Sequence, residues 1–388
     1  MIKVRIGNEK STVIDFPCSD NVLNEKLKEI GVGEQIPSRA TITEVLEPKD
    51  LPLKLHLIHN LDEMNYLAKR LDSFTPHEMD TFMEMVKTEE YYMPYDFINA
   101  TFNLQCYALF QDVSSMEKVG KEYMFSKRGC ISQSEIESTD FAALGKEILN
   151  NGEITITDHG LLCKVEGAEI NQVYNGTTFP EYDYTGSSLI TVELSYYDNT
   201  EYLYLPDDDW AIVKAVARLG ADSVDDCKCL MSDISTDIGG TKKMLNDVLE
   251  YEDLFAVNKI TSYINIADMD LKKLQALIEY ADATDSTTIC VLAERIDDFT
   301  YIEDIEDDED IGKYFVENDG DYSVSAELED FIKYDELGEH LREEMDGKFG
   351  EHGYVSMNNQ VDTLEQILEE YSGQIRGVTM GGDQKSVV

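Results

Sequence analysis

The feature that most constrains this chain is that it repeats itself. Residues 2–31 and residues 191–220 both read as strand, turn, strand and then a helix that ends at a glycine. At a constant offset of 189 residues, three positions carry the same residue: Pro17 and Pro206, Asp20 and Asp209, Gly31 and Gly220. A chain with two such stretches is expected to fold as two similar copies rather than around one large core.

The match continues at slightly larger offsets, as short insertions require. The stretch "DVSSMEKVGKEYMF" from Asp112 matches "DIEDDEDIGKYFVE" from Asp304, which places Gly120 opposite Gly312. Two further pairs of segments match: "FAALGKEIL" at 141–149 with "KYDELGEHL" at 333–341, and "DHGLL" at 158–162 with "EHGYV" at 351–355. We therefore predict a tandem duplication.

Strands and helices come in blocks rather than in alternation, which is typical of an α+β fold. Each copy is predicted to hold a small antiparallel sheet with one helix, then a helical part, then a mixed C-terminal part, and the whole is expected to be elongated. The predicted boundaries are 1–165 for the first copy (1–53, 54–125, 126–165), 166–189 for a linker, 190–357 for the second copy (190–250, 251–316, 317–357) and 358–388 for a C-terminal helix and tail.

The clearest local helix signal lies in the first copy. Thr75 and Glu78 have the spacing of a capping box, and Pro76 stands at the first helical position. The apolar residues that follow form one stripe at helical spacing and are expected in the core: Met79, Phe82, Met83 and Val86.

Composition limits what the chain can bind. It has 79 acidic and 32 basic residues, a formal charge of −47 over 388 residues, yet 42% of it is hydrophobic, which is enough to build a core. We expect no direct binding of nucleic acid, because a polyanion needs a basic footprint and the closest run, "FSKRG", is too short. No apolar window is long enough to cross a membrane, and seven scattered cysteines are typical of reduced thiols. We expect a cytoplasmic protein.

No catalytic or cofactor motif stands out. The sequence has no phosphate-binding loop, dinucleotide fingerprint, nucleophile elbow or H-E-x-x-H motif, and we predict no catalytic residue, no cofactor and no metal. His159 and His352 occupy equivalent places and each precedes a glycine, so a turn residue bonded to a backbone carbonyl is expected rather than a catalytic base. Cys227 and Cys229 are expected to be buried structural thiols rather than part of a zinc site.

The acidic residues are concentrated rather than spread. Residues 297–346 contain 21 acidic and 3 basic residues, which is too one-sided for a surface of alternating salt bridges. As a helix, "YDELGEHLREEM" has an apolar side and an acidic side: Leu337, Leu341 and Met345 against Glu336, Glu339 and Glu343. Repulsion among these like charges is tolerable if a cationic groove of a partner binds them. The excess of 47 negative charges equals that of about 24 base pairs of duplex DNA.

Three segments of the second copy resemble the ArdA antirestriction family. They are the acidic stretch 304–317, "FIKYDELGEHL" at 331–341 and "HGY" at 352–354. The resemblance is strongest over 254–357 and fainter in the first copy. It implies a protein of a phage or mobile element that mimics B-form DNA and blocks type I restriction-modification enzymes of the bacterial host. Typical members have the size of one copy and form elongated homodimers, so we expect this chain to be a fused, asymmetric pseudo-dimer, with further self-association left open.

The resemblance also implies a protein that is not an enzyme, whose carboxylates replace DNA phosphates in the DNA-binding groove of its target. The candidate residues in the second copy are Asp297, Asp298, Glu303, Asp304, Glu306, Asp307, Glu309, Asp310, Asp335, Glu336, Glu339, Glu343 and Glu344. The first copy has Ser114, Ser115 and Met116 in place of an acidic triplet and is expected to be the weaker mimic. It offers Asp112, Glu117 and Glu122. Two alternatives stay open: inhibition of a CRISPR effector or other DNA-scanning defence complex, and an acidic scaffold for protein-protein interaction.

Overall fold

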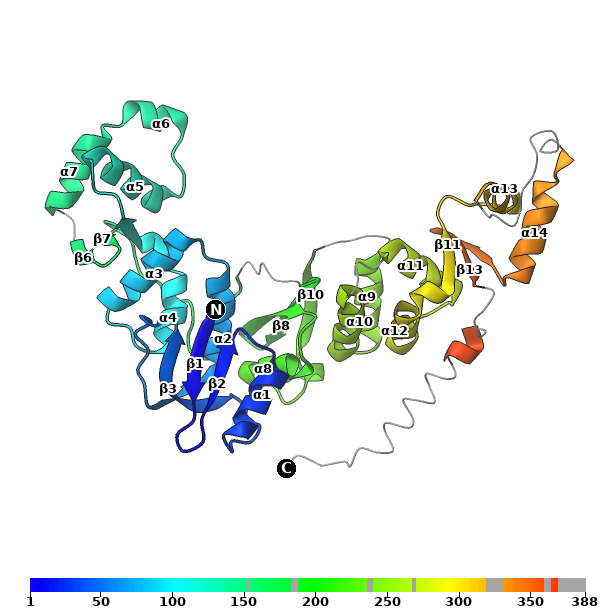
Figure 1. The fold of residues 1–388 in the computed structure, drawn as a ribbon, viewed down its shortest axis with the longest axis horizontal. Helices are drawn as coiled ribbons and strands as arrows, with labels where there is room; N and C mark the ends of the chain where they lie inside the picture. Colours follow the sequence, from blue (N-terminus) through cyan, green and yellow to red (C-terminus); the bar gives the residue numbers. More distant parts are fainter. Residues whose placement is uncertain are drawn as a thin grey trace. The chain divides into compact units, whose positions relative to one another are not determined.

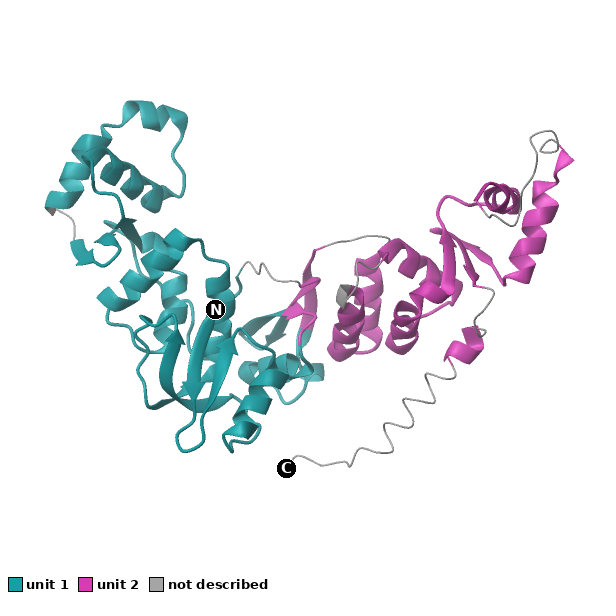
Figure 2. Ribbon diagram, viewed as in Figure 1, with its two compact units in different colours: residues 1–186, 193–203, 208–228 teal, residues 187–192, 204–207, 229–388 magenta. Residues whose placement is uncertain are grey.

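The computed structural model describes residues 1–151, 154–182, 188–235, 240–266, 270–318, 331–358 and 364–368. Helices and small sheets are mixed along the chain (Figure 1), which confirms the predicted α+β class. The chain divides into two compact units (Figure 2): a first unit of residues 1–186, 193–203 and 208–228, and a second unit of residues 187–192, 204–207 and 229–388. The division follows spatial contacts and does not coincide with the predicted boundary between copies.

The chain begins with a four-stranded sheet and one helix. In sequence order these elements are β1 (Ile2–Ile6), β2 (Thr12–Phe16), α1 (Asp20–Glu29), β3 (Arg39–Glu47) and β4 (Leu57–Asn60). The strands lie in the order β2-β1-β3-β4, and neighbouring strands pair antiparallel. Alternate residues of β1 are fully buried, namely Ile2, Val4 and Ile6, because successive side chains of a strand point to opposite faces.

A helical part follows, made of α2 (Leu61–Asp72), α3 (Pro76–Thr88), α4 (Pro94–Thr101) and the short 3-10 helix η1 (Leu104–Cys106). The predicted capping box of α3 is confirmed: Thr75 accepts from the backbone N–H of Glu78, whose carboxylate accepts from the N–H of Thr75. The predicted stripe is confirmed too, since Phe82, Met83 and Val86 are buried and Met79 is half-buried.

Residues 107–165 form what we call the first C-terminal part. It contains β5 (Tyr107–Phe110), α5 (Met116–Arg128), α6 (Gln133–Ser138), α7 (Phe141–Asn151), β6 (Ile154–Thr157) and β7 (Gly160–Lys164). Its three strands lie in the order β5-β7-β6. Helices α5 and α7 pack on this sheet around Val119, Ile148 and Cys163.

Residues 166–182 fall in the predicted linker, yet they pack against the first unit. Tyr174 is 1% exposed, and its hydroxyl donates to the carboxylate of Glu63 at 3.1 Å. The ring of Phe179 stacks on that of Tyr66, with the centroids 4.5 Å apart. The aromatic residues of this segment gain enough by burial to order it, so it extends the first unit rather than acting as a free tether.

A second small sheet with one helix comes next. Its elements are β8 (Ile190–Tyr196), β9 (Asn199–Leu205), α8 (Asp209–Leu219), the 3-10 helix η2 (Val224–Asp226) and β10 (Lys228–Ile234), with the strand order β10-β8-β9. In the first unit α8 lies against α1, and Lys214 of α8 is 2% exposed. Its ammonium donates to the carboxylates of Asp20 and, at 2.6 Å, Asp62. Cys227 and Cys229 are half-buried, so the expectation that they are buried is wrong.

The rest of the second unit consists of a helical part and a mixed part. The helices are α9 (Thr241–Tyr251), α10 (Leu254–Ile266), α11 (Leu271–Tyr280), α12 (Ser286–Glu294) and the 3-10 helix η3 (Ile296–Asp298). Residues 299–357, the second C-terminal part, contain β11 (Phe299–Ile302), α13 (Asp308–Asn318), α14 (Tyr334–Glu344), β12 (Lys348–Gly350) and β13 (Gly353–Met357), with the strand order β11-β13-β12. Residues 364–368 are helical; of the predicted C-terminal helix and tail at 358–388, residues 359–363 and 369–388 lie outside the described residues.

The predicted duplication stays a prediction, which the order of elements supports. The strand order β2-β1-β3 corresponds to β9-β8-β10, and β5-β7-β6 corresponds to β11-β13-β12. Close contacts also correct one pairing of segments. A Cβ on Gly145 would meet the backbone of α5, and a Cβ on Gly338 would meet the backbone of α13 in the same way. Gly145 therefore corresponds to Gly338, one residue away from the predicted alignment of these two helices.

Candidate partner-binding surface

The second C-terminal part holds its acidic helices on a small apolar core. Ile302 of β11 and Tyr354 of β13 pack against Ile311 and Phe315 of α13 and Leu341 of α14. Tyr354 and Ile311 are fully buried. This core explains why aromatic and branched apolar residues alternate with so many carboxylates in this stretch of sequence. The apolar side chains attach the helices to the sheet, and the carboxylates are exposed on the surface.

Two glycines bring α13 and α14 unusually close together. A Cβ on Gly312 would lie 2.1 Å from the carbonyl oxygen of Tyr334, and a Cβ on Gly338 would lie 1.7 Å from the carbonyl oxygen of Asp308. Any larger side chain would therefore push the two backbones apart. The two helices that carry most of the carboxylates are therefore in direct backbone contact.

Helix α14 has the two sides that its sequence predicts. Leu341 is buried and Leu337 and Met345 pack partly buried against the core, while Glu336, Glu339 and Glu343 are exposed. With a rise of about 1.5 Å per residue, these three carboxylates follow one another at intervals of about 4.5 and 6 Å along the helix. One face of α14 is therefore a row of negative charges.

The structure divides the candidate residues into two groups. Asp297 and Asp298 belong to η3 and precede β11, whereas the others follow β11 or lie on α13 and α14. A strand of four residues thus separates Asp297 and Asp298 from the rest, although they are close in sequence. We call the larger group the acidic surface: Glu303, Asp304, Glu306, Asp307, Glu309, Asp310, Asp335, Glu336, Glu339, Glu343 and Glu344. All of these are exposed except Asp310, which is half-buried.

Basic side chains neutralise part of both groups. The ion pairs are Arg295 with Asp298 at 2.5 Å, Lys313 with Glu309 at 2.6 Å, Lys272 with Glu303 and Lys333 with Glu336. His340 lies 3.8 Å from Glu344 and forms an ion pair with it only when its ring is protonated. Hydrogen bonds to these carboxylates raise the pKa of Lys272, Lys313 and Lys333. Lys272 lies on α11, and sequence spacing offered no signal for its contact with Glu303.

The remaining candidates of the second copy make no ion pair with any residue that the structure describes: Asp297, Asp304, Glu306, Asp307, Asp310, Asp335, Glu339 and Glu343. Asp308, which was not a candidate, forms two hydrogen bonds with Arg342 of α14, at 2.7 and 3.2 Å. That pair holds the two helices together. Seven unpaired carboxylates are therefore left on the acidic surface, along with the four paired ones.

The first copy's three candidates are all paired. Lys118 contacts Asp112 and, by a hydrogen bond, holds the pKa of that carboxyl below its usual range. Lys121 contacts Glu117 at 2.7 Å, and His77 contacts Glu122 at 3.2 Å. Glu117 and Glu122 lie on α5, and Asp112 precedes it; each of the three carboxylates has a basic side chain within 4 Å.

The two histidines before glycine are bonded differently from what the sequence predicts. His159 lies in the turn between β6 and β7, and its Nδ1 is 2.6 Å from a carboxylate oxygen of Glu84 on α3. His352 lies in the turn between β12 and β13, and its Nδ1 is 2.7 Å from a carboxylate oxygen of Glu279 on α11. The expected backbone carbonyl is wrong: each ring is held by a carboxylate far away in sequence.

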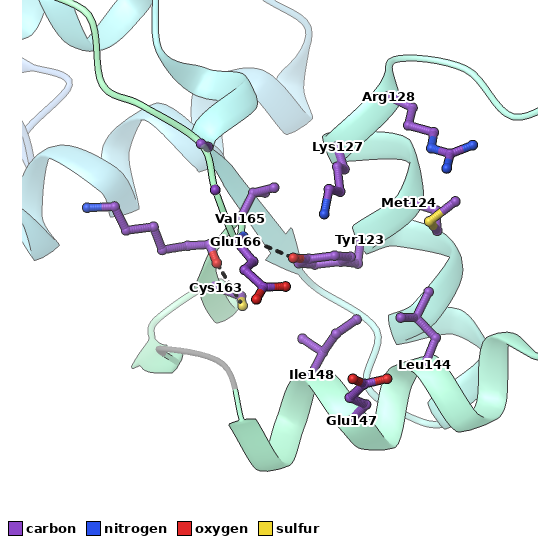
Figure 3. A pocket seen from close by; sticks show the side chains of 13 residues that line it. Tyr123, Met124, Lys127, Arg128, Leu144, Glu147, Ile148, Cys163, Val165 and Glu166 are labelled. Carbon is purple, nitrogen blue, oxygen red and sulfur yellow. Dashed lines mark hydrogen bonds between the residues drawn. The ribbon is translucent and has the colours of Figure 1, made fainter.

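A pocket of about 530 Å³ opens in the first C-terminal part, between α5, α7 and the end of β7. Figure 3 shows that the side chains lining it include charged ones, Lys127, Glu147 and Glu166, and apolar ones such as Ile148. The hydroxyl of Tyr123 accepts the backbone N–H of Glu166 at 3.0 Å. Because the charges that line it have both signs, this pocket does not extend the acidic surface.

Comparison with known proteins adds no relative: no protein-family model matches the chain, and no curated protein matches it. Among the described residues, no three His, Cys, Asp or Glu side chains come together in a way that could hold a metal ion. In the same part of the chain, no helix combines the length and apolar character needed to cross a membrane.

Proposed function

We propose that this protein is a non-catalytic antirestriction protein, similar to the ArdA family, that mimics DNA and occupies the DNA-binding groove of a type I restriction-modification enzyme. The observation that carries the proposal is the acidic surface. Its carboxylates lie on α13, on α14 and in the loop before α13, the two helices are brought into close contact by a pair of glycines, and most of the carboxylates form no ion pair with a described residue. Because such enzymes act on intracellular DNA, the proposal places the protein in the cytoplasm of a bacterial host.

Charge density and rigidity both favour this function. Duplex DNA carries one negative charge per about 1.7 Å of its axis, which is denser than the row on α14 alone. The exposed carboxylates of α13 and of the loop before it add further negative charge to the same part of the chain. A folded polyanion also releases its own associated cations when a basic groove binds it, as DNA does, and it avoids the ordering cost of a flexible acidic tail.

The proposal is tested by adding the purified chain to a type I restriction enzyme that cleaves unmodified duplex DNA. We expect inhibition near one inhibitor per enzyme, relieved by excess duplex DNA. Affinity should fall steeply, by roughly a thousandfold, between about 50 and 200 mM salt if some six phosphate contacts are replaced. Inhibition that neither DNA nor salt relieves would argue for an apolar interface instead. Inhibition of a CRISPR effector but of no type I enzyme would change the proposed target.

A further inference from the structure

The contact between His352 and Glu279 gives this histidine a role that the acidic surface alone does not assign. Glu279 stands at the end of α11 and accepts two bonds from the β12–β13 turn: the His352 ring at 2.7 Å and the backbone N–H of Glu351 at 3.0 Å. A Cβ on Gly350 would lie 2.5 Å from the same carboxylate, so the turn is fitted closely around it. One carboxylate thus holds the whole turn.

Neighbouring bonds fasten the same hairpin to the same helix end. The hydroxyl of Tyr280 donates to the carbonyl oxygen of Asp346 at 2.9 Å, and Lys348 donates to the carbonyl oxygen of Tyr280 at 2.8 Å. Strand β13 in turn pairs with β11, and Tyr354 of β13 packs in the core beneath α13 and α14. The acidic helices are therefore attached to α11 through this hairpin.

The first unit makes the same kind of contact with a different carboxylate. The helices α3 and α11 end alike, since Glu90 and Asp282, 192 residues apart, both have positive φ, at 56° and 50°. By that alignment Glu279 corresponds to Lys87, whereas the partner of His159 is Glu84, about one helical turn earlier. His159 and His352 are thus each hydrogen-bonded to a carboxylate, although Glu84 and Glu279 do not occupy equivalent positions on their helices. This indicates that the contact itself is what both parts require.

We propose that the His352–Glu279 pair is a positioning contact: it fixes the second C-terminal part on α11 and so determines the direction in which the acidic surface faces, without itself touching the partner. The expected effect of this pair on inhibition rests on the proposed function, whereas its expected effect on the attachment of the hairpin to α11 is independent of that function.

The test compares three variants of the full chain. His352→Ala removes the ring, His352→Asn keeps an N–H donor near the position of Nδ1, and His159→Ala removes the matching contact in the first unit as a control. Amide hydrogen exchange by mass spectrometry reports on residues 348–357 and 154–164, and the type I cleavage assay reports on inhibition.

We expect His352→Ala to speed exchange in 348–357 about tenfold while residues around Leu341 stay protected, and to raise the concentration for half-inhibition about tenfold. His352→Asn should stay near wild type in both measurements. His159→Ala should speed exchange in 154–164 and leave inhibition unchanged. Unchanged exchange in His352→Ala would overturn the proposal, and so would faster exchange with unchanged inhibition. If the wild-type chain inhibits no restriction enzyme, the proposed function fails, while the exchange data still decide whether the contact fixes the hairpin.

Discussion

The two C-terminal parts share a strand order and a pair of closely packed helices but differ in charge. Both have a three-stranded sheet in which the last strand lies in the centre, and both have two helices that meet at a pair of glycines. Residues 112–151 contain 7 acidic and 5 basic residues, whereas residues 304–344 contain 17 acidic and 3 basic residues. The apolar core and the glycines are enough to specify the arrangement, so the charge of the outer face is free to differ.

A similar difference separates α1 from α8. At the offset of 189 residues, Glu25 of α1 corresponds to Lys214 of α8. Glu25 is exposed, whereas Lys214 is buried between Asp20 and Asp62. One position therefore carries opposite charges in opposite surroundings, and the α1–α8 contact is asymmetric. Aligned as the predicted duplication requires, α1 and α8 are both helices but differ in electrostatics at this position.

The largest expected effect on stability is at Lys214. Lys214→Met leaves two carboxylates buried without their cation, which should lower the free energy of unfolding by about 3–5 kcal/mol. Glu25→Met, at the corresponding exposed position, should change it by less than about 0.5 kcal/mol. Urea denaturation measures both. The triple variant that adds Asp20→Asn and Asp62→Asn should recover part of the loss, and a Lys214→Met chain of wild-type stability would contradict the asymmetry described above.

A smaller effect is expected at the glycines, and it should be equal in the two parts. A Cβ on Gly338 or on Gly145 would lie 1.7 or 2.0 Å from a backbone oxygen of the facing helix. Each Gly→Ala change should therefore lower the free energy of unfolding by about 1–3 kcal/mol through steric overlap. This loss exceeds the gain of about 1 kcal/mol that alanine brings through its higher helix propensity. Gly33→Ala, which meets nothing within 4 Å, serves as the control. Unequal losses in urea denaturation would show that the two parts differ in packing as well as in charge.

The smallest effect is a pH dependence in the first C-terminal part. The hydrogen bond to Glu84 raises the pKa of His159; Asp80 raises it further, while burial and Lys87 lower it. A raised pKa in the folded state means that the contact stabilises the fold fully below the unfolded value of about 6.5 and loses strength as pH rises through the folded pKa. Because His159 is 41% exposed, the contribution should stay below about 1 kcal/mol.

An NMR titration of the His159 ring tests this directly. We expect a midpoint above 6.5 in the wild-type chain and a lower one in Glu84→Gln, which removes the charge and keeps the shape of the partner. A midpoint that does not move in Glu84→Gln would show that Asp80, not Glu84, governs the ring.

Local sequence patterns predicted local structure well. The capping box of α3 and the two-sided helix α14 both depend on residues within one or two turns, which periodicity can detect. Contacts between distant residues were not predictable in this way. Nothing in the sequence around Lys272 indicates that it neutralises Glu303, and the burial of Tyr174 in the predicted linker depends on surfaces supplied by α2 and α4. The predicted sequence alignment of α7 with α14 differs by one residue from the alignment that the contacts of Gly145 and Gly338 indicate, and the sequence alone does not show those contacts.

The most direct test of the account is to remove the charge of the acidic surface while keeping its shape. One variant replaces its unpaired carboxylates by Asn or Gln: Asp304, Glu306, Asp307, Asp310, Asp335, Glu339 and Glu343. The control variant replaces Asp112, Glu117 and Glu122 of the first copy in the same way. With both variants as stable as wild type, we expect the first to inhibit type I cleavage at least about a hundredfold more weakly, since it lacks the counterion release of seven phosphate-like contacts, and the control to inhibit normally. Equal inhibition by the first variant and the wild-type chain would contradict the claim that these carboxylates imitate DNA.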